Sequence, residues 1–475
     1  MKKKINQLIE KIKRNKVLSA GIGYTIGNYL LKGLGFITVP IFSRIMEVSD
    51  YGTYNTFLSY ESMLYLFVGL ALHSSIKNAK YKYGDDKLNV YTSSITLIPL
   101  GISAFMLLSG NILFHFISKV IKIGRLEYSL LVIYCLCSSL LYIYQSRLII
   151  EYKTNKYLWV SYFNAIVSII CSIFLIQSVF VEKKYLGRIL GTVIPMVMIG
   201  VWILYNLYKE SRPKVELNYW KFGLKISLPI IPHGIGQVIL TSFDRIMITN
   251  ILGATQAGLY SFAYTLYSII LVAGNSISSV FEPWAYEMIS SGKVGVLKRR
   301  AAQYTMLLAV ISSGVMLIAP ELVVILGSEK YLGSIPAISP IMFAGFFMMA
   351  YSLPATIEYY HEKTIYIALG TSAAAIINIV LNAVLIPQYG YVAAAYTTLI
   401  SCALYFVFHC FVSHRIAKYS IIPMKSLFVS ILLLTISAIL SQVFKETIVI
   451  RFLWATVVGG IGIGVIMKYF KFGEE

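Results

Sequence analysis

Charged side chains interrupt several long apolar segments of this 475-residue chain. Lys32 and Glu61 fall near the middle of two such segments, and Asp244 and Arg245 fall in the outer half of a third. A charge at the centre of a bilayer costs about 2.5–3.5 kcal/mol on insertion scales, so these residues are candidates for binding a polar ligand or an ion. The candidates that would line a ligand cavity are Lys32, Arg44, Glu61, Arg147, His233 and Arg245. Asp244 and Glu61 are the candidates for binding a coupling ion.

Each of these residues also has a purely structural interpretation. Lys32 and Glu61 would form an ion pair between two helices, and Asp244 and Arg245 would pair with neighbours for packing. Arg44 would extend its charge to the membrane surface. Three further histidines are expected to be interfacial or packed: His73, His115 and His409.

Composition places these charges in a membrane protein. Hydrophobic residues make up 57% of the chain and charged residues 13%, whereas soluble domains carry about 25% charged residues. This excludes an ordinary soluble enzyme, a disordered protein and a disulfide-rich scaffold. The formal charge of +20 would suggest a nucleic-acid partner in a soluble chain. In so apolar a chain it indicates a polytopic membrane protein, and no nucleic-acid partner is expected.

Motifs for enzymatic chemistry are missing from the sequence. It contains no Walker A, H-E-x-x-H or G-x-S-x-G pattern and no Cys/His cluster, so we expect neither an enzyme, nor a catalytic residue, nor a metal site. All five cysteines lie in apolar runs and are expected to be buried thiols: Cys135, Cys137, Cys171, Cys402 and Cys410.

A membrane-spanning helix needs about 20 mostly apolar residues, and fourteen segments qualify. They are residues 18–43, 52–75, 91–117, 128–147, 158–181, 186–208, 223–251, 258–283, 301–326, 335–357, 365–386, 391–412, 426–444 and 449–467. With both termini on the cytoplasmic side, 29 of the 41 Lys and Arg residues fall on cytoplasmic segments and ten on external ones. This bias supports the orientation.

An internal repeat divides the chain. Residues 32–46 and 233–247 match without gaps at six of fifteen positions, including a Gly-x-Gly and an arginine. The repeat predicts an all-α fold of two six-helix lobes related by a pseudo-two-fold along the membrane normal, plus two C-terminal helices. The expected parts are a cytoplasmic interfacial N-terminus (1–17), an N-lobe (18–210), a C-lobe (211–413) and a C-terminal part (414–475). Four residues are predicted hinges: Gly33, Gly35, Pro229 and Pro232.

Three stretches carry a resemblance to a known family. Phe243–Ile248, followed by Leu252–Ala254 and Ala257–Ser261, resembles the seventh-to-eighth span signature of polysaccharide flippases of the multidrug/oligosaccharidyl-lipid/polysaccharide exporter superfamily. Asn378–Asn382, continuing to Ala395, resembles the eleventh-to-twelfth span signature, and Gly27–Tyr54 is similar to the first span.

The resemblance implies a flippase of the bacterial cytoplasmic membrane. It would move undecaprenyl-diphosphate-linked oligosaccharides from the inner to the outer leaflet by alternating access, for O-antigen or capsule export. It implies no cofactor, an Na⁺ or H⁺ gradient or downstream consumption as the driving force, and membrane lipids, a polysaccharide polymerase and chain-length machinery as partners. The alternatives are a flippase for another lipid-linked substrate or a drug/cation antiporter of the same superfamily, and, in a different class, a membrane glycan polymerase.

Overall fold

The computed structural model describes residues 16–471, and this part of the chain is helical, without a β-strand. The interfacial helix expected at the N-terminus falls on residues outside this range. Contacts divide the chain into two compact units, Met1–Ile235 and Gly236–Glu475. The segment after residue 210 packs with the first unit, because α10 lies against η1 and α4. The division into functional lobes at residue 210 stays a prediction.

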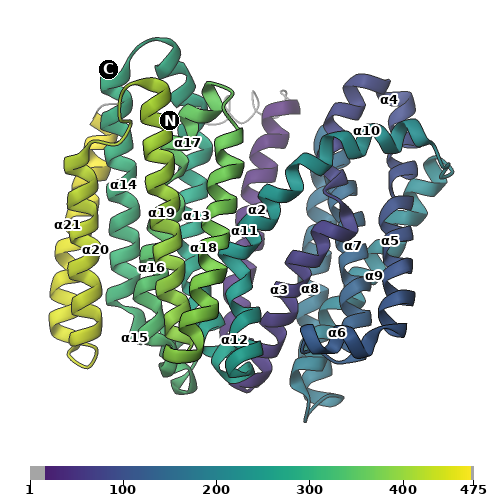
Figure 1. Cartoon of the computed structure of the whole chain (residues 1–475), viewed down its shortest axis with the longest axis horizontal. Helices are drawn as coiled ribbons and strands as arrows, with labels where there is room; N and C mark the ends of the chain where they lie inside the picture. The colour runs from purple at the N-terminus through teal and green to yellow at the C-terminus, as the bar shows by residue number, and fades with distance from the viewer. Residues whose placement is uncertain (1–15, 472–475) are drawn as a thin grey trace, which may run out of the picture. The chain divides into compact units, whose positions relative to one another are not determined.

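The first unit consists of long helices and a few short connecting turns (Figure 1). These are α2 (Lys16–Ile45), α3 (Val48–Gly69), η1 (Leu72–Ser75), α4 (Ile76–Ile95), α5 (Leu97–Ile112), α6 (Phe114–Val120), α7 (Arg125–Ile150), α8 (Thr154–Ser178), α9 (Lys184–Glu210), α10 (Leu217–Ser227), η2 (Leu228–Ile230) and the start of α11 (Ile231–Val238).

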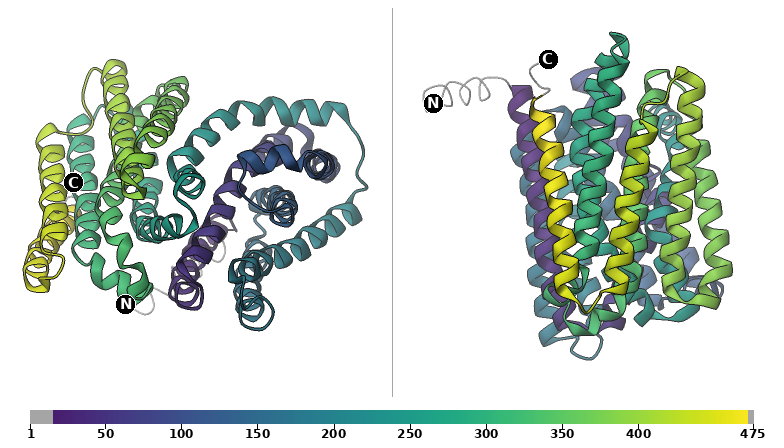
Figure 2. Two further views of the ribbon diagram at one scale, coloured as in Figure 1. Left: turned by 60° about the horizontal axis from the view of Figure 1, so that its bottom comes forward. Right: turned by 90° about the vertical axis from the view of Figure 1, so that its left-hand side faces the viewer.

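The second unit contains the remaining helices. These are η3 (Ile239–Phe243), α12 (Asp244–Leu252), α13 (Ala254–Ser290), α14 (Val294–Leu317), α15 (Ala319–Leu326), η4 (Glu329–Ser334), α16 (Ile335–Ala350), α17 (Ser352–Tyr360), α18 (Ile365–Tyr389), α19 (Tyr391–Ala417), α20 (Met424–Val443) and α21 (Ile448–Lys471). The last two helices lie side by side, and both pack on α14 (Figures 1 and 2).

Twelve helices among the described residues are long and apolar enough to cross a membrane, and a thirteenth span is formed if α14 and α15, bent by 66°, count as one. The sequence predicts about fourteen spans. The difference is α3, the predicted second span, which is too polar to pass by hydropathy because it carries Asp50, Glu61 and several hydroxyl and amide residues. The chain is an all-α polytopic membrane protein.

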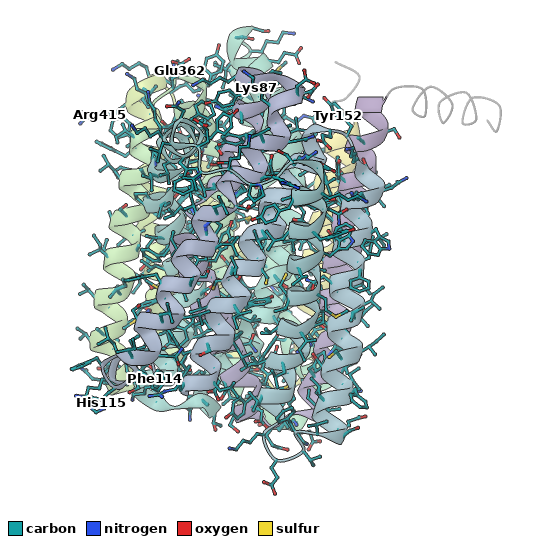
Figure 3. The ribbon with its side chains drawn as sticks, turned by 90° about the vertical axis from the view of Figure 1, so that its right-hand side faces the viewer. Lys87, Phe114, His115, Tyr152, Glu362 and Arg415 are labelled. Carbon is teal, nitrogen blue, oxygen red and sulfur yellow. The ribbon has the colours of Figure 1, made fainter. Side chains whose placement is uncertain are left out.

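Helix ends alternate within each unit as a multi-span topology requires. In the first unit Lys87 and Tyr152 lie at one end of the bundle, and Phe114 and His115 lie at the other (Figure 3). In the second unit Glu362 and Arg415 share one end (Figure 3). Segments predicted to face the same side of the membrane therefore lie at the same end of their unit.

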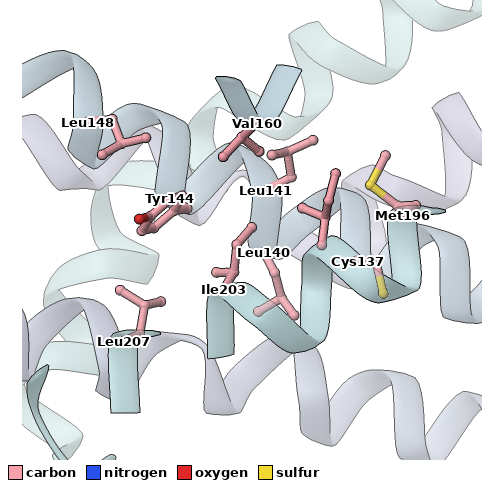
Figure 4. Packing of buried hydrophobic residues seen from close by; sticks show 10 residues of the cluster. Cys137, Leu140, Leu141, Tyr144, Leu148, Val160, Met196, Ile203 and Leu207 are labelled. Atoms are coloured by element: carbon pink, nitrogen blue, oxygen red, sulfur yellow. The ribbon is translucent and has the colours of Figure 1, made fainter. Parts of the chain in front are cut away.

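Close packing of α7, α8 and α9 forms the core of the first unit (Figure 4). Cys137, Tyr144 and Ile203 are among its buried side chains. Small residues bring α8 and α9 together, since a Cβ on Gly191 would lie 2.4 Å from the Cα of Ser172. Lipid tails are as apolar as leucine, so contact between small residues is a main source of stability here.

The predicted seventh span lies in a continuous helix, Leu217–Leu252, which changes helix type where its prolines fall. Pro229 lies in the 3₁₀ turn η2 and Pro232 lies in the first turn of α11. A π-helical turn, η3, then precedes α12. The π turn shifts the helical register just before Asp244, and such turns are frequent at functional sites. Whether the prolines act as a hinge stays a prediction.

Candidate functional site

Asp244 is the centre of a buried polar network in the second unit. Its side chain is 1% exposed. The carboxylate accepts hydrogen bonds from the hydroxyl of Tyr260 (2.6 Å), the hydroxyl of Thr398 (2.7 Å) and the amide of Asn382 (2.7 Å). Its three short hydrogen-bond partners are neutral, and the neighbouring Arg245 acts on the carboxylate through its charge.

A second layer fixes these donors. The amide of Asn382 also donates to the side-chain oxygen of Asn378 (3.1 Å), and the hydroxyl of Thr397 donates to the side-chain oxygen of Asn382. The hydroxyl of Thr398 also contacts the carbonyl of Ala394 (2.9 Å). Carboxylate, amide, hydroxyl and carbonyl oxygens are the ligands that hard cations prefer, and a protonated carboxyl would suit the same partners.

Four helices meet at this carboxylate: α12, α13, α18 and α19. A close approach helps to bring α11 and α18 together, because a Cβ on Gly236 would lie 2.6 Å from the side chain of Thr371. Four side chains of the network fall within the motifs that carry the family resemblance, namely Asp244, Tyr260, Asn378 and Asn382. The motifs are therefore the oxygen-rich surroundings of one acidic residue.

Arg245 follows Asp244 and faces differently. Its guanidinium lies over the ring of Tyr264, 4.6 Å from the centroid. Its buried Nε atom has no hydrogen-bond partner, and Arg245 forms no ion pair among the residues that the structure describes. An unpaired guanidinium of this kind is suited to an anion such as phosphate.

Lys32 lies exposed on α2, in the middle of an apolar helix. Its ammonium is 5.9 Å from the ring centroid of Tyr29. It forms no ion pair with Glu61 within residues 16–471, so the structural interpretation of those two residues is not supported. Glu61, half-buried on α3, has Ser138 of α7 as a hydrogen-bond partner.

Arg147 belongs to an ion cluster at the end of α7. It is 4% exposed and contacts Glu151 (2.8 Å) and Glu210 (2.6 Å), and Lys153 contacts Glu151 (2.6 Å). Burial raises the pKa of Glu151, but hydrogen bonds and charge from Lys153 and Arg147 outweigh it and hold the pKa below its ordinary value. The guanidinium is thus occupied by carboxylates, which favours a structural role.

The remaining predicted residues occupy α2 and α11. His233 is half-buried in the first turn of α11, and Arg44 is exposed in the last turn of α2. Gly33 and Gly35 lie within the uninterrupted α2, and a Cβ on either would meet nothing within 4 Å. These two glycines are therefore not needed for packing inside the first unit.

Arg188 is a candidate that the sequence interpretation missed, because it appeared to be an ordinary external cation. It lines a pocket of about 190 Å³ in the first unit, together with Thr38, Phe42, Tyr54 and Asn55. Its guanidinium lies 3.6 Å from the ring centroid of Phe42 and donates to Ser172 (2.7 Å). The sequence feature that could have identified Arg188 is its position one turn into an apolar span.

Comparison with known proteins identifies the class and then the family. A family model described as "Polysaccharide biosynthesis protein" matches residues 18–289, more than half of the chain. The chain belongs to this family.

Curated relatives extend over most of the chain. A protein of the Lsg locus of Haemophilus influenzae is 25% identical over 335 residues, which cover 66% of this chain and 78% of that protein. A membrane protein of Methanocaldococcus jannaschii is 20% identical over 464 residues, or 90% of each chain.

Solved structures show the same fold. The lipid II flippase MurJ in an inward closed conformation aligns with a TM-score of 0.73 at 15% identity, covering 94% of this chain and 99% of that chain. An inward-facing multidrug resistance MATE family transporter of the MOP superfamily aligns with a TM-score of 0.59 at 13% identity, covering 81% and 97%. At this identity the likeness establishes the fold.

Proposed function

We propose that this protein is a flippase for lipid-linked oligosaccharides. It moves undecaprenyl-diphosphate-linked repeat units from the inner to the outer leaflet of a bacterial cytoplasmic membrane, for O-antigen or capsular polysaccharide export. It works by alternating access, with both termini in the cytoplasm, and it catalyses no covalent step.

The observation that carries the proposal is the family match to polysaccharide biosynthesis proteins in a chain with a transporter fold. A polysaccharide pathway needs a step that carries a polar glycan across the bilayer. A membrane protein without enzyme motifs suits that step better than glycan polymerisation does.

Unpaired cations support a substrate with a diphosphate. Arg245 and Lys32 form no ion pairs among the described residues, and Arg188 lies in an aromatic pocket large enough for a phosphate or one sugar ring. Arginine binds phosphate through two parallel N–H donors, and aromatic rings pack against the apolar faces of sugars. These residues would hold the headgroup while the lipid tail stays in the bilayer.

Asp244 is the proposed coupling site. A carboxylate that accepts hydrogen bonds from the hydroxyls of Tyr260 and Thr398 and from the Asn382 amide would take up a proton, or would bind Na⁺ with the two hydroxyl oxygens as further ligands. Either event removes a buried negative charge, and this changes the relative stability of two conformations of the second unit. The gradient of that ion would then drive export.

A deletion strain tests the function. We expect it to lose surface polysaccharide and to accumulate lipid-linked repeat units of full length, because synthesis continues while translocation stops. Incomplete repeat units would indicate an assembly enzyme, and polysaccharide of altered chain length would indicate a role in polymerisation. An unchanged glycan with increased drug sensitivity would favour a drug/cation antiporter.

A further inference from the structure

A second buried ionisable pair lies in the second unit, apart from the Asp244 network. Glu358 on α17 and His409 on α19 are both 0% exposed, and the His409 Nδ1 atom lies 2.7 Å from the Glu358 carboxylate. The outer atom of each group, Glu358 Oε2 and His409 Nε2, is buried without a hydrogen-bond partner. The sequence predicts only that His409 is interfacial or packed.

Every helix packed against the pair contributes neutral or distant groups. On α19, Tyr405 lies 4.6 Å from the His409 ring, edge to face, and Cys410 is adjacent. Tyr351, which follows α16, lies 5.5 Å from the His409 ring. The other titratable groups are Tyr359 on α17 and Glu282 on α13, and both act electrostatically on Tyr351.

The pair also packs closely against α18 at Gly370. A Cβ on Gly370 of α18 would lie 2.8 Å from His409 Nε2, so this glycine leaves the imidazole just enough room. Glu358 forms no ion pair with a lysine or arginine among residues 16–471. A negative charge on Glu358 therefore has the His409 imidazole as its direct partner.

The net charge of the Glu358–His409 pair determines how many protons it holds when it is buried. With a neutral imidazole and an ionised carboxylate, the pair carries a net charge of −1, and a buried charge without a partner is strongly disfavoured. One additional proton, on either group, makes the pair neutral overall. The buried state therefore holds one proton more than the same two groups would hold if they were exposed to water at pH 7 to 8.

We propose that Glu358 and His409 form a proton-binding site, which holds one exchangeable proton while the pair is buried and releases it when the surrounding helices open. The route to water is short. Glu358 lies two residues before the end of α17, and the following loop, residues 361–364, is exposed, with Glu362 at one end of the unit (Figure 3).

The site is connected to the Asp244 network through one helix. Thr398 and His409 are both on α19, eleven residues apart, which places them on nearly the same face and about 16 Å apart along the axis. A shift of α19 would change the surroundings of both sites. This lobe would thus sense H⁺ at one site and a cation or proton at the other.

Nuclear magnetic resonance of the purified full-length protein, with ¹⁵N-labelled histidine, tests the proposal without any transport substrate. The His409 signal is the one that disappears in H409Q. We expect its ¹⁵N shifts to report proton uptake by the pair within the range pH 5 to 9, and we expect E358Q, which removes the carboxylate charge, to abolish or move that uptake. E358D, which keeps the charge, should retain the wild-type behaviour.

The experiment needs a control variant and a second way to assign the His409 signal. H414Q, at an exposed position on the same helix, should leave the His409 titration unchanged. Should H409Q fail to fold, single substitutions of the other five histidines assign the His409 signal by elimination. His409 shifts that have the same pH dependence in the wild type and in E358Q would overturn the proposal and leave the pair structural. Neither result bears on whether the protein moves a glycan.

Discussion

At the scale of single residues, the structure separates cations that are paired from cations that are not. Arg147 contacts two carboxylates, and Arg451 makes a two-pronged contact with Glu321 (2.5 and 2.8 Å). Arg245 forms no ion pair within the described chain. This distinction predicts which substitutions damage transport and which damage stability.

Asp244→Asn should reduce glycan export roughly tenfold or more, because a hydrogen bond to a charged group contributes about 1.5–3 kcal/mol and the variant also loses the ionisable oxygen. Surface polysaccharide per molecule of protein is the measurement. Asp85→Asn is the matched control, since Asp85 is largely exposed beside Lys80 (3.3 Å). Normal export by Asp244→Asn would remove this carboxylate from the coupling mechanism.

Arg245→Ala should impair glycan export, whereas Arg147→Ala should lower the stability of the fold. We expect Arg245→Ala to abolish export with an almost unchanged thermal midpoint in detergent. Arg147→Ala leaves Glu151 and Glu210 without their common partner and should destabilise the fold by about 3–5 kcal/mol. The two variants are compared by thermal unfolding and by surface glycan, and equal loss of stability would refute the distinction.

The sequence was enough to predict which charged residues matter, but it could not predict their hydrogen-bond partners. Hydropathy alone singles out Asp244 and Arg245, because a charge in an apolar run is conspicuous. The donors to Asp244 come from positions 16, 138 and 154 residues away, and only the folded arrangement of helices brings them together. The contact between Glu358 and His409, which are 51 residues apart, was not predicted for the same reason.

At the scale of elements, the 3₁₀ turn in the seventh span is the feature with the clearest consequence. Proline at an interior helical position removes a hydrogen bond and its ring clashes with the carbonyl of residue i−4. Replacing Pro229 and Pro232 together by alanine should convert the 3₁₀ turn to α-helix, preserve folding and slow export several-fold. Export at wild-type rate would show that the 3₁₀ turn is only structural.

The ion cluster that ends α7 should respond to acid. The pKa of Glu151 is lowered in the folded state, so its stabilising contribution is present above the ordinary glutamate pKa of about 4.5 and is lost as the pH falls through the folded value. Thermal unfolding between pH 7 and 3 measures this. Glu151→Gln should flatten that part of the profile, whereas Glu446→Gln, at an exposed position, should not.

Element-scale prediction succeeded where the signal was local. Apolar length located helices at all fourteen expected positions, and the prolines mark the place where the helix containing the seventh span changes type. The π turn before Asp244 has no local signature in Ile239–Phe243, and in the structure it packs against α18 and α19. The polar α3 shows the limit of hydropathy, since its polar residues are accommodated by neighbouring helices rather than by lipid.

At the scale of the whole molecule, the orientation in the membrane is predicted from the distribution of cations. Reporter fusions after Asp86 and after Lys183 should lie on the cytoplasmic and external sides respectively. Lys183 is exposed directly before α9, and Asp86 is exposed on α4 two residues after the kink at Gly84, so the fusions should not disturb packing. Two reports from the same side would contradict the predicted topology.

The central claim is that the protein carries a lipid-linked glycan from one leaflet to the other. Labelling of spheroplasts with a membrane-impermeant reagent that reacts with the glycan tests it most directly. With the protein present, lipid-linked repeat units should be labelled from outside. In the deletion strain they should accumulate and become labelled only after the membrane is permeabilised. Equal labelling of intact spheroplasts with and without the protein would contradict the account.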